Sequence, residues 1–492
     1  KGRTTWEHCR ARFPAHLTRG LPTDDYYRGT QISYPMFGLG GPMPDYGKLV
    51  RLGIDGLCEE VRRHQQAADD GQASGFYDSL LGALDLFASA ARSYADQAER
   101  MRSGAESPEA AERFRLIAQS CRHIAGAPPH SYHEAIQLVW LYTLVALPKN
   151  YGRMDVVLGD WLAHDLDAGV LTREQALEMT LGLWRQIDRR GNHFNNRMVL
   201  GGLGRPNVEN ADRFVLLALE AQGILGNPIP QIALRWHEGM DPAIRDRALA
   251  VIGKGSTQPM LYNDDVNVPA VARGFDVPID EAAQYVMYGC GEYVIDHRSV
   301  GSPDAATNLV KAMNVTLFNG RDPFFGEARG LALGALGDFP TFDALRDALT
   351  RQIDHEIGLL AEAQALVYQV TGEEAGFPLL SLLYDDCIER GRPLLAGGVR
   401  YLGGTCEAFG ASTVSDSLVA IRRAVYEEKI IAPDELLQVL ESDFEGREDL
   451  RKRLLAYPKF GNDDAEADGM NLWFNGMLCE SCRAHGRRVG LD

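Results

Sequence analysis

The chain has 492 residues, of which 45% are hydrophobic and 24% are charged, so it has enough apolar side chains for a large globular core. Its formal net charge of −18 opposes contact with the phosphate backbone of nucleic acids, and we predict no nucleic-acid partner. The longest apolar run, residues 135–147, contains Gln137 and is too short to span a bilayer. We therefore expect a buried helix there and no membrane partner.

The cysteine pattern bears on the cellular compartment. The sequence starts at Lys1 and shows no signal-peptide pattern of basic residues followed by an apolar run. Its eight cysteines are scattered along the chain, which favours reduced thiols over a disulfide framework. We expect a cytoplasmic protein.

The first quarter of the chain divides into an irregular part and a helical part. Residues 1–45 are rich in proline, glycine and tyrosine, which predicts irregular structure. Residues 46–122 have apolar side chains at helical spacing, such as Leu80, Leu84 and Phe87. We assign residues 1–130 to an N-terminal irregular and helical region.

Alternating signals for helices and strands follow. Ser131-x-x-Glu134 and Thr172-x-x-Gln175 are capping boxes that predict helix starts. The short runs 195–202 and 231–236 are rich in β-forming residues, and each precedes a helical stretch. This alternation predicts parallel strands joined by helices, so we assign residues 131–492 to part of an α/β barrel.

Polar side chains in the two predicted strands are candidate substrate contacts. Asn195 and Asn196 open the first run, and Arg235 lies near the end of the second. An equally good interpretation is that they form hydrogen bonds at the strand ends.

The most distinctive stretch is Met287–Tyr293, in which Cys290 stands between Gly289 and Gly291 and Glu292 follows. Glycine adopts positive φ at little cost, so these residues predict a sharply bent loop that presents the thiol. We interpret it as a catalytic finger loop with Cys290 and Glu292 as the reacting groups. The alternative is that Cys290 is a small buried hydrophobic residue.

Two later features have structural and functional interpretations. Residues 305–318 are predicted to form a helix, with Asp304 either as its N-cap or as a contact to a substrate hydroxyl. Cys479-x-x-Cys482 places two thiols on one helix face. A single pair of this kind favours a structural role over a metal site, and we predict no metal ligands.

Several of these motifs together resemble the glycyl radical enzymes of the dehydratase and lyase branch. The resemblance rests on Gly-Cys-x-Glu at 289–292, on Pro259–Asp265 and on Gly152-Arg153-Met154-Asp155, and it extends from about residue 110 to the end of the sequence. It implies part of a ten-stranded α/β barrel of the glycyl radical enzyme and ribonucleotide reductase type. Because the finger has one cysteine instead of two adjacent ones, it is more similar to the eliminases than to the pyruvate formate-lyase type.

The resemblance also implies a reaction. Cys290 would carry a transient thiyl radical that takes a hydrogen atom from a hydroxylated carbon, and Glu292 would be the general base. The result would be a 1,2-elimination of water, an amine or sulfite from a small polar substrate, which is the reaction of a dehydratase or lyase.

The radical source is expected to lie outside this sequence. Family members end in a segment of the type Arg-Val-x-Gly-Tyr whose glycine stores the radical, and no such segment precedes Asp492. Three accounts follow: a second polypeptide that completes the barrel and carries the glycyl radical, a fragment of a longer chain, or adenosylcobalamin as the source. A second polypeptide is favoured because part of a barrel would leave an unpaired strand edge.

Two further hypotheses come from other functional classes. The chain could be a non-catalytic scaffold or regulatory subunit derived from a radical enzyme. Cys290 could also act as an ionic nucleophile with a histidine base, for which His297 is the nearest candidate in the sequence after the finger.

Overall fold

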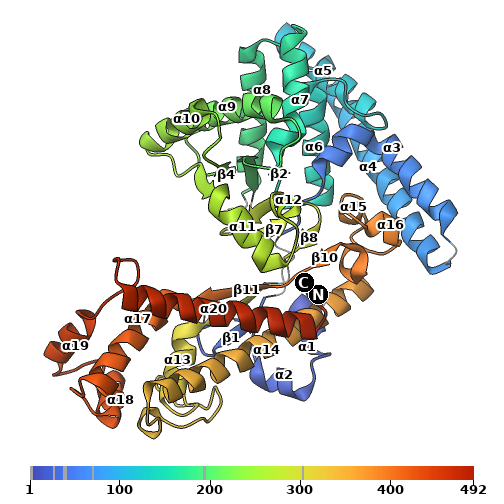
Figure 1. Ribbon diagram of the computed structural model, residues 1–492. Coiled ribbons are helices and arrows are strands. Elements are labelled where there is room, and N and C mark those ends of the chain that lie inside the picture. Colours follow the sequence, from blue (N-terminus) through green and yellow to red (C-terminus); the bar gives the residue numbers. More distant parts are fainter. Residues whose placement is uncertain (1–3, 26–27, 37–40, 69–70, 192–195, 302–303) are drawn as a thin grey trace. The chain divides into compact units, whose positions relative to one another are not determined.

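The chain forms two units in a computed structural model that describes residues 4–25, 28–36, 41–68, 71–191, 196–301 and 304–492 (Figure 1). The first unit contains residues 1–39, 302–370 and 403–492, and the second contains residues 40–301 and 371–402. The predicted boundary at residue 130 lies inside the second unit, where α5 (Pro108–Ile124) packs against α6 (Tyr132–Ala146). The two units do not correspond to the predicted division into residues 1–130 and 131–492. The assignment of residues 131–492 to the barrel therefore stays a prediction.

Helices form the N-terminal part of the second unit, as predicted for residues 46–122. They are α3 (Tyr46–Ala67), α4 (Gly71–Ser103) and α5, of which α4 and α5 pack side by side (Figure 1). The predicted apolar positions Leu80, Leu84 and Phe87 are buried in the core of this unit. The apolar helix α6 begins after Ser131, whose side chain accepts a hydrogen bond from the Glu134 N–H, as its capping motif predicts.

A parallel sheet follows, and its strands alternate with helices. The strand order is β2-β3-β4-β5, and the bounds are Gly152–Arg153, Arg197–Gly201, Gln231–Trp236 and Met260–Asn263. The helices that alternate with them are α7 (Met154–Asp167), α8 (Arg173–Arg189), α9 (Val208–Leu225), α10 (Pro242–Gly253) and α11 (Asp264–Phe275). The α/β alternation predicted from the sequence is confirmed, and so is the Thr172 capping box that opens α8.

The second unit is completed by short elements. They are α12 (Ile279–Ala282), β6 (Tyr285–Tyr288), β7 (Glu292–Ile295), β8 (Ser299–Val300), α15 (Pro378–Ser381), α16 (Cys387–Arg390) and β10 (Tyr401–Leu402). Strands β6 and β7 form an antiparallel hairpin, and β8 pairs with β10 in parallel.

The first unit has its own sheet and helices. In its sheet, β9 (Asp304–Asn308) pairs in parallel with β11 (Thr405–Phe409) and antiparallel with β1 (Ser33–Pro35). Its helices are α1 (Thr5–Arg10), α2 (Ala15–Gly20), α13 (Leu309–Leu317), α14 (Phe342–Glu374), α17 (Ala411–Ile421), α18 (Pro433–Glu441), α19 (Glu448–Leu455) and α20 (Ala465–Arg488).

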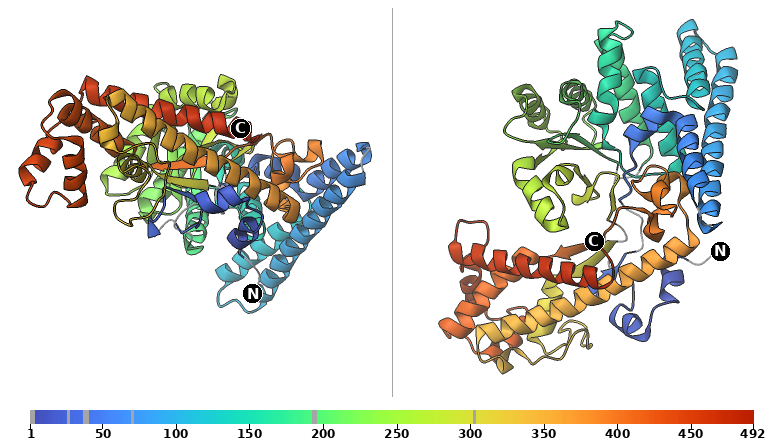
Figure 2. Two further views of the ribbon diagram at one scale, coloured as in Figure 1. Left: turned by 90° about the horizontal axis from the view of Figure 1, so that it is seen from below. Right: turned by 45° about the vertical axis from the view of Figure 1, so that its right-hand side comes forward.

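The two long helices of the first unit, α14 and α20, lie side by side (Figure 2). Asp354 of α14 accepts hydrogen bonds from Ser481 of α20 at 2.7 Å and from His485 at 3.0 Å. Cys482 of α20 forms a hydrogen bond with Cys406 of β11, which fits the structural role predicted for Cys479-x-x-Cys482.

One predicted helix begins later than expected. Residues 305–308 belong to strand β9, and α13 starts only at Leu309. The N-cap is Asn308, whose side chain accepts a hydrogen bond from the Lys311 N–H at 3.0 Å, so the N-cap role predicted for Asp304 was wrong. The alanines at 305 and 306 extend because they pair on both sides with distant strands.

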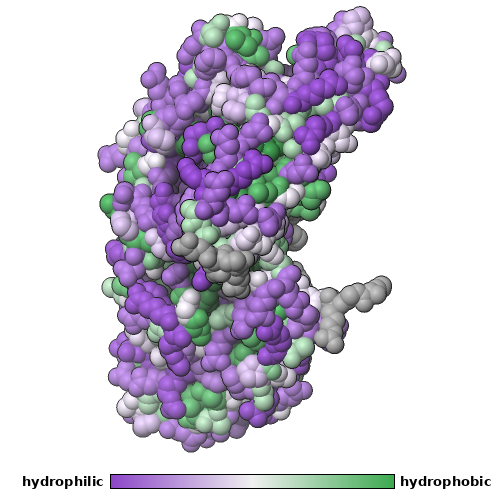
Figure 3. Space-filling model, turned by 90° about the vertical axis from the view of Figure 1, so that its right-hand side faces the viewer, coloured by the Kyte–Doolittle hydropathy of each residue, from purple (hydrophilic) through white to green (hydrophobic). Residues whose placement is uncertain are grey.

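Within the described residues, no helix is long and apolar enough to cross a membrane. On the face shown in Figure 3, hydrophilic residues predominate and hydrophobic ones are scattered among them.

Candidate active site

The predicted finger loop is the tip of the β6–β7 hairpin. Tyr288 pairs with Glu292 across the strands, and the Gly291 N–H donates to the Tyr288 carbonyl at 2.9 Å. Gly289 and Gly291 have φ values of 51° and 132°. Residues that carry a β-carbon rarely adopt such positive φ values, whereas glycine does so at little cost. The two glycines thus allow the tight turn that places Cys290 at the tip, where it is exposed.

The carboxylate of Glu292 folds back against this turn. Its Oε2 accepts a hydrogen bond from the Gly291 N–H at 3.2 Å. A β-carbon at Gly289 would collide with the same oxygen. Glycine at position 289 therefore serves both the turn and the carboxylate, and it keeps Glu292 close to the residue that carries the thiol.

A buried ion pair fixes the base of the hairpin. Arg235, near the end of β4, donates from Nε and NH2 to the two carboxylate oxygens of Asp264, at 2.9 and 2.8 Å. Both side chains have 0% exposure. The same guanidinium donates to the carbonyls of Tyr285 and Ala283 at 2.8 and 2.9 Å, and the Tyr285 hydroxyl donates to Asp264 at 2.8 Å. The pair thus joins β4 and the start of α11 to the first residue of β6.

A second buried arginine holds the tip of the hairpin. Arg197 opens β3 and is 1% exposed. Its NH2 donates to the Gly289 carbonyl at 2.6 Å and to the Gln231 side chain at 3.3 Å. Arg197 lies at the start of β3, and Arg235 lies near the end of the parallel strand β4. The base of the hairpin is therefore at the carboxyl ends of β3 and β4, and its tip is at their amino ends.

The hairpin tip is surrounded by side chains that can carry positive charge and by side chains that can carry negative charge. Burial lowers the pKa of the Arg197 guanidinium, whereas the acidic side chains of Tyr262, Glu292 and Cys290 raise it. Burial raises the pKa of the Tyr262 phenol, so its hydroxyl stays protonated at neutral pH. This oxygen lies 3.1 Å from the position of a β-carbon on Gly291. The tip therefore combines a thiol, a carboxylate, a phenol and a guanidinium.

The structure brings some of the predicted site residues together and leaves others apart. Cys290 and Glu292 share the hairpin tip. Arg235 is enclosed at the hairpin base, which supports its alternative role in strand-end hydrogen bonding, and its contact with substrate stays a prediction. Asn195 lies outside the described residues, and Asp304 contributes its backbone to β9 in the first unit. Their substrate contacts also stay predictions.

Arg197 and Tyr262 were missed by the sequence interpretation. Arg197 stands two residues after Asn195 in the same predicted strand, and Tyr262 lies inside the Pro259–Asp265 motif. A charged residue at the start of an otherwise apolar strand is a signal that sequence inspection can use, since such a charge needs a specific partner when buried. The signal does not reveal that partner.

Comparison with known proteins identifies the family. The sequence profile described as pyruvate formate lyase-like matches residues 24–490. The chain belongs to this family. It is 26% identical to (2S)-3-sulfopropanediol dehydratase of Klebsiella oxytoca over 96% of this chain and 60% of that protein. It is 25% identical to isethionate sulfite-lyase of Bilophila wadsworthia over 91% of this chain and 58% of that protein.

A solved structure shows the same fold. The glycerol-bound, B12-independent glycerol dehydratase from Clostridium butyricum superimposes with a TM-score of 0.88 at 23% identity, over 98% of this chain and 63% of that one. The family profile and the relatives confirm the predicted membership in the glycyl radical enzyme group, and this superposition confirms the predicted barrel-type fold. This pyruvate formate lyase-like chain spans about 60% of the length of the relatives that it matches.

His297, the base considered for an ionic mechanism, lies beyond the far end of the hairpin from Cys290. Strand β7 separates the two residues, and its four residues span about 13 Å at about 3.3 Å per residue. Burial alone would lower the pKa of His297, but a hydrogen bond to Asp385 and the charges of Asp45 and Asp296 raise it to about 9. A histidine that is protonated at neutral pH cannot act as a general base.

The buried ion pair at the hairpin base gives a stability prediction. Asp264→Asn keeps the shape of the side chain but leaves the Arg235 charge buried without a counterion, so we expect a loss of about 3–5 kcal/mol in the free energy of unfolding. The matched control is Asp246→Asn, which removes a pair with Arg245 whose side chains are 65% and 63% exposed; its cost should be at most about 1 kcal/mol. Urea denaturation measures both, and equal costs would contradict the anchoring role.

The His297–Asp385 pair gives a pH prediction. The folded-state pKa of about 9 exceeds the ordinary value of about 6.5, so the pair contributes its full stability below about pH 6.5 and loses it as the pH rises through about 9. His297→Asn keeps an N–H donor and tolerates the positive φ of 47° but removes the charge. We expect it to cost roughly 2–3 kcal/mol at pH 6 and much less near pH 10. A pH-independent cost in urea denaturation would refute this.

Proposed function

We propose that this chain carries the catalytic hairpin of a radical lyase, which removes a group from the carbon next to a hydroxylated carbon in a small polar substrate. The observation that carries the proposal is the hairpin tip, where Cys290 is exposed and the Glu292 carboxylate folds back onto the Gly291 N–H. The names of two relatives, a sulfopropanediol dehydratase and an isethionate sulfite-lyase, support this reaction class.

The proposed reaction begins with Cys290 as a thiyl radical. It takes a hydrogen atom from the hydroxylated carbon, which forms an S–H bond and leaves an unpaired electron on that carbon. Glu292 accepts the hydroxyl proton, and the resulting negative charge expels the leaving group from the neighbouring carbon with its bonding electron pair. Hydroxide or an amine nitrogen takes up the proton from Glu292 and departs as water or an amine, whereas sulfite departs as the anion and Glu292 returns its proton to solvent. The product radical then takes the hydrogen atom back from Cys290, which regenerates the thiyl radical.

Glu292 is suited to the proton transfer because a general base must lie within hydrogen-bond reach of the proton that it accepts. Its oxygen is held against the same turn that presents the thiol. Both groups can therefore approach one hydroxylated carbon, one at the C–H bond and the other at the O–H bond.

Arg197 and Tyr262 support a polar substrate. Arg197 uses NH2 for the Gly289 carbonyl, whereas its buried Nε and NH1 have no hydrogen-bond partner among the described residues. Buried donors without partners are costly, so an oxygen-rich ligand that reaches them gains favourable hydrogen bonds. We propose that Arg197 and the Tyr262 hydroxyl bind oxygen atoms of the substrate, and that Arg197 also fixes the position of the Cys290 turn.

The radical source is part of the same proposal. A thiol S–H bond is too strong for acid–base chemistry to produce a thiyl radical, so a radical donor has to reach Cys290, whose exposure allows this. We propose a glycyl radical in a second polypeptide, with adenosylcobalamin as the alternative. Denaturing chromatography of the anaerobically purified complex, with mass and absorbance detection, distinguishes a second polypeptide from a corrinoid; finding neither would contradict both.

A cytoplasmic location also belongs to the proposal. It rests on the cysteines, none of which forms a disulfide within the described structure.

The two rival functions differ in their support. The distance of His297 from Cys290 and its raised pKa oppose the ionic mechanism with this histidine as the base. A non-catalytic scaffold does not require the Glu292 carboxylate to lie against the turn of the thiol. The scaffold hypothesis predicts no chemistry at any substrate carbon.

Substitutions at the tip test the proposal. In the anaerobically activated enzyme, Cys290→Ser should abolish turnover, because a hydroxyl cannot replace the thiyl radical. Glu292→Gln should reduce kcat by about 10²–10⁴-fold, the usual contribution of a general base, without changing the circular dichroism spectrum. The control is Cys479→Ser, at another exposed cysteine, which should retain activity. A Glu292→Gln enzyme with more than about a tenth of normal turnover would exclude Glu292 as the base.

A further inference from the structure

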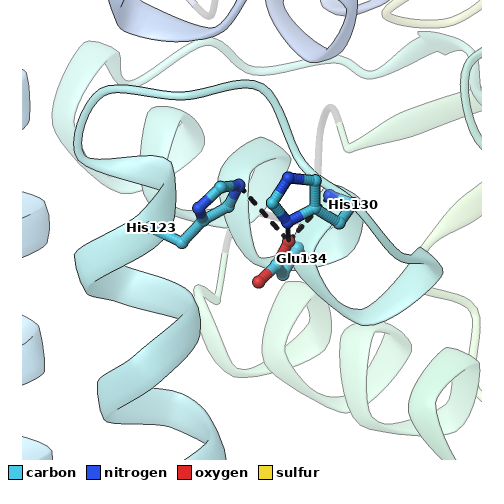
Figure 4. A group of neighbouring side chains, drawn as sticks. All are labelled: His123, His130 and Glu134. Carbon is cyan, nitrogen blue, oxygen red and sulfur yellow. Dashed lines mark hydrogen bonds and ion pairs between the residues drawn. The ribbon is translucent and has the colours of Figure 1, made fainter.

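Two histidines and a glutamate meet where α5 is joined to α6, in a part of the second unit that the proposed reaction does not use. His123 lies in the last turn of α5, His130 in the connecting segment and Glu134 in the first turn of α6. Figure 4 shows both imidazole rings directed towards the carboxylate of Glu134. The distances from Glu134 Oε2 are 3.8 Å to His123 Nε2 and 3.8 Å to His130 Nδ1.

The charge of Glu134 is poorly balanced. Its side chain is only 15% exposed, and its ionic partners within the described residues are these two histidines, with no lysine or arginine. Neither partner is a permanent cation, and a partly buried carboxylate without a counterion is unfavourable. A cation between the three side chains would remove this imbalance.

Two other groups of potential ligands differ in this respect. In the group of Asp45, His297 and Asp385, the histidine is held as a cation by its carboxylate neighbours and already supplies the positive charge. In the group of Glu60, His64 and Glu389, Lys48 lies 3.1 Å from Glu60. Among these three groups, the α5–α6 group is the one in which neither a histidine held as a cation nor a lysine balances the charge of the carboxylate.

We propose that His123, His130 and Glu134 bind a divalent transition-metal ion, with Zn²⁺ as the best match. Two imidazole nitrogens and one carboxylate oxygen are ligands that Zn²⁺ accepts, whereas Ca²⁺ and Mg²⁺ prefer oxygen ligands alone. Ligands about 2.1 Å from a tetrahedral Zn²⁺ lie about 3.4 Å apart. The two carboxylate–histidine separations of 3.8 Å need to shorten by only a few tenths of an ångström, and all three ligand atoms lie within 4.8 Å of one another.

Metal binding would exchange existing contacts for stronger ones. His123 Nε2 now lies 2.8 Å from the Pro128 carbonyl, and this hydrogen bond would be replaced by the bond to the metal. Glu134 Oε2 accepts the His130 backbone N–H at 2.7 Å, which can persist as a second interaction that orients the ligand. Three protein ligands leave a fourth tetrahedral position for water. The ion would link the end of α5 to the start of α6 and stabilise this junction.

Metal titration of the purified chain tests the site. We expect isothermal titration with Zn²⁺ alone to show one equivalent whose affinity falls at least about 100-fold in His130→Ala and in Glu134→Gln, since even loss of an outer-shell partner costs about 10–100-fold. In Glu134→Gln the amide oxygen can still accept the His130 N–H, so the start of α6 is retained. Zn²⁺ should also raise the Tm of the wild type but not of these variants.

The control is His164→Ala, which removes another exposed histidine next to a carboxylate in the same unit and should bind Zn²⁺ like the wild type. Co²⁺ provides a check on ligand identity, because binding at this site should give no sulfur-to-metal charge-transfer band. Wild-type Zn²⁺ affinity in both His130→Ala and Glu134→Gln, or a strong sulfur-to-metal band for the tightest site, would overturn the proposal.

Discussion

The buried ion pair between Arg235 and Asp264 is the interaction on which the geometry of the candidate site depends. Removing two charges from water costs several kcal/mol per ion unless their geometry and hydrogen bonds compensate. Here the guanidinium uses Nε, NH1 and NH2, and Asp264 also accepts from the Tyr285 hydroxyl. The carbonyls that complete this network belong to Ala283 and Tyr285. The hydrogen bonds that stabilise the buried ion pair therefore also fix the start of the hairpin.

From this base the hairpin carries the thiol to a tip that has an anchor of its own. Its strands run along the parallel sheet, and Arg197 captures the Gly289 carbonyl at the other end. The two glycines of the tip then leave room for the Glu292 carboxylate beside the turn. A rigid sheet thus positions a short, exposed turn, which is the usual division of labour between scaffold and reactive loop.

Local features of this fold were predictable from the sequence, and features set by distant partners were not. The hairpin turn follows from Gly289 and Gly291 themselves, and the start of α8 follows from Thr172 and Gln175. By contrast, strand β9 owes its existence to pairing with residues 33–35 and 405–409, which no local pattern reveals. For the same reason the contact of Arg197 with Gly289, 92 residues away, was missed.

The central claim is that Cys290 takes a hydrogen atom from a hydroxylated carbon and returns it to the product. It is tested most directly by substrates deuterated at that carbon, chosen from small diols and hydroxylated sulfonates and turned over by the anaerobically activated complex. The account predicts a primary isotope effect and deuterium on the adjacent carbon of the product, detected by mass spectrometry and NMR. A product that carries only solvent hydrogen at that carbon, formed without an isotope effect, would contradict it.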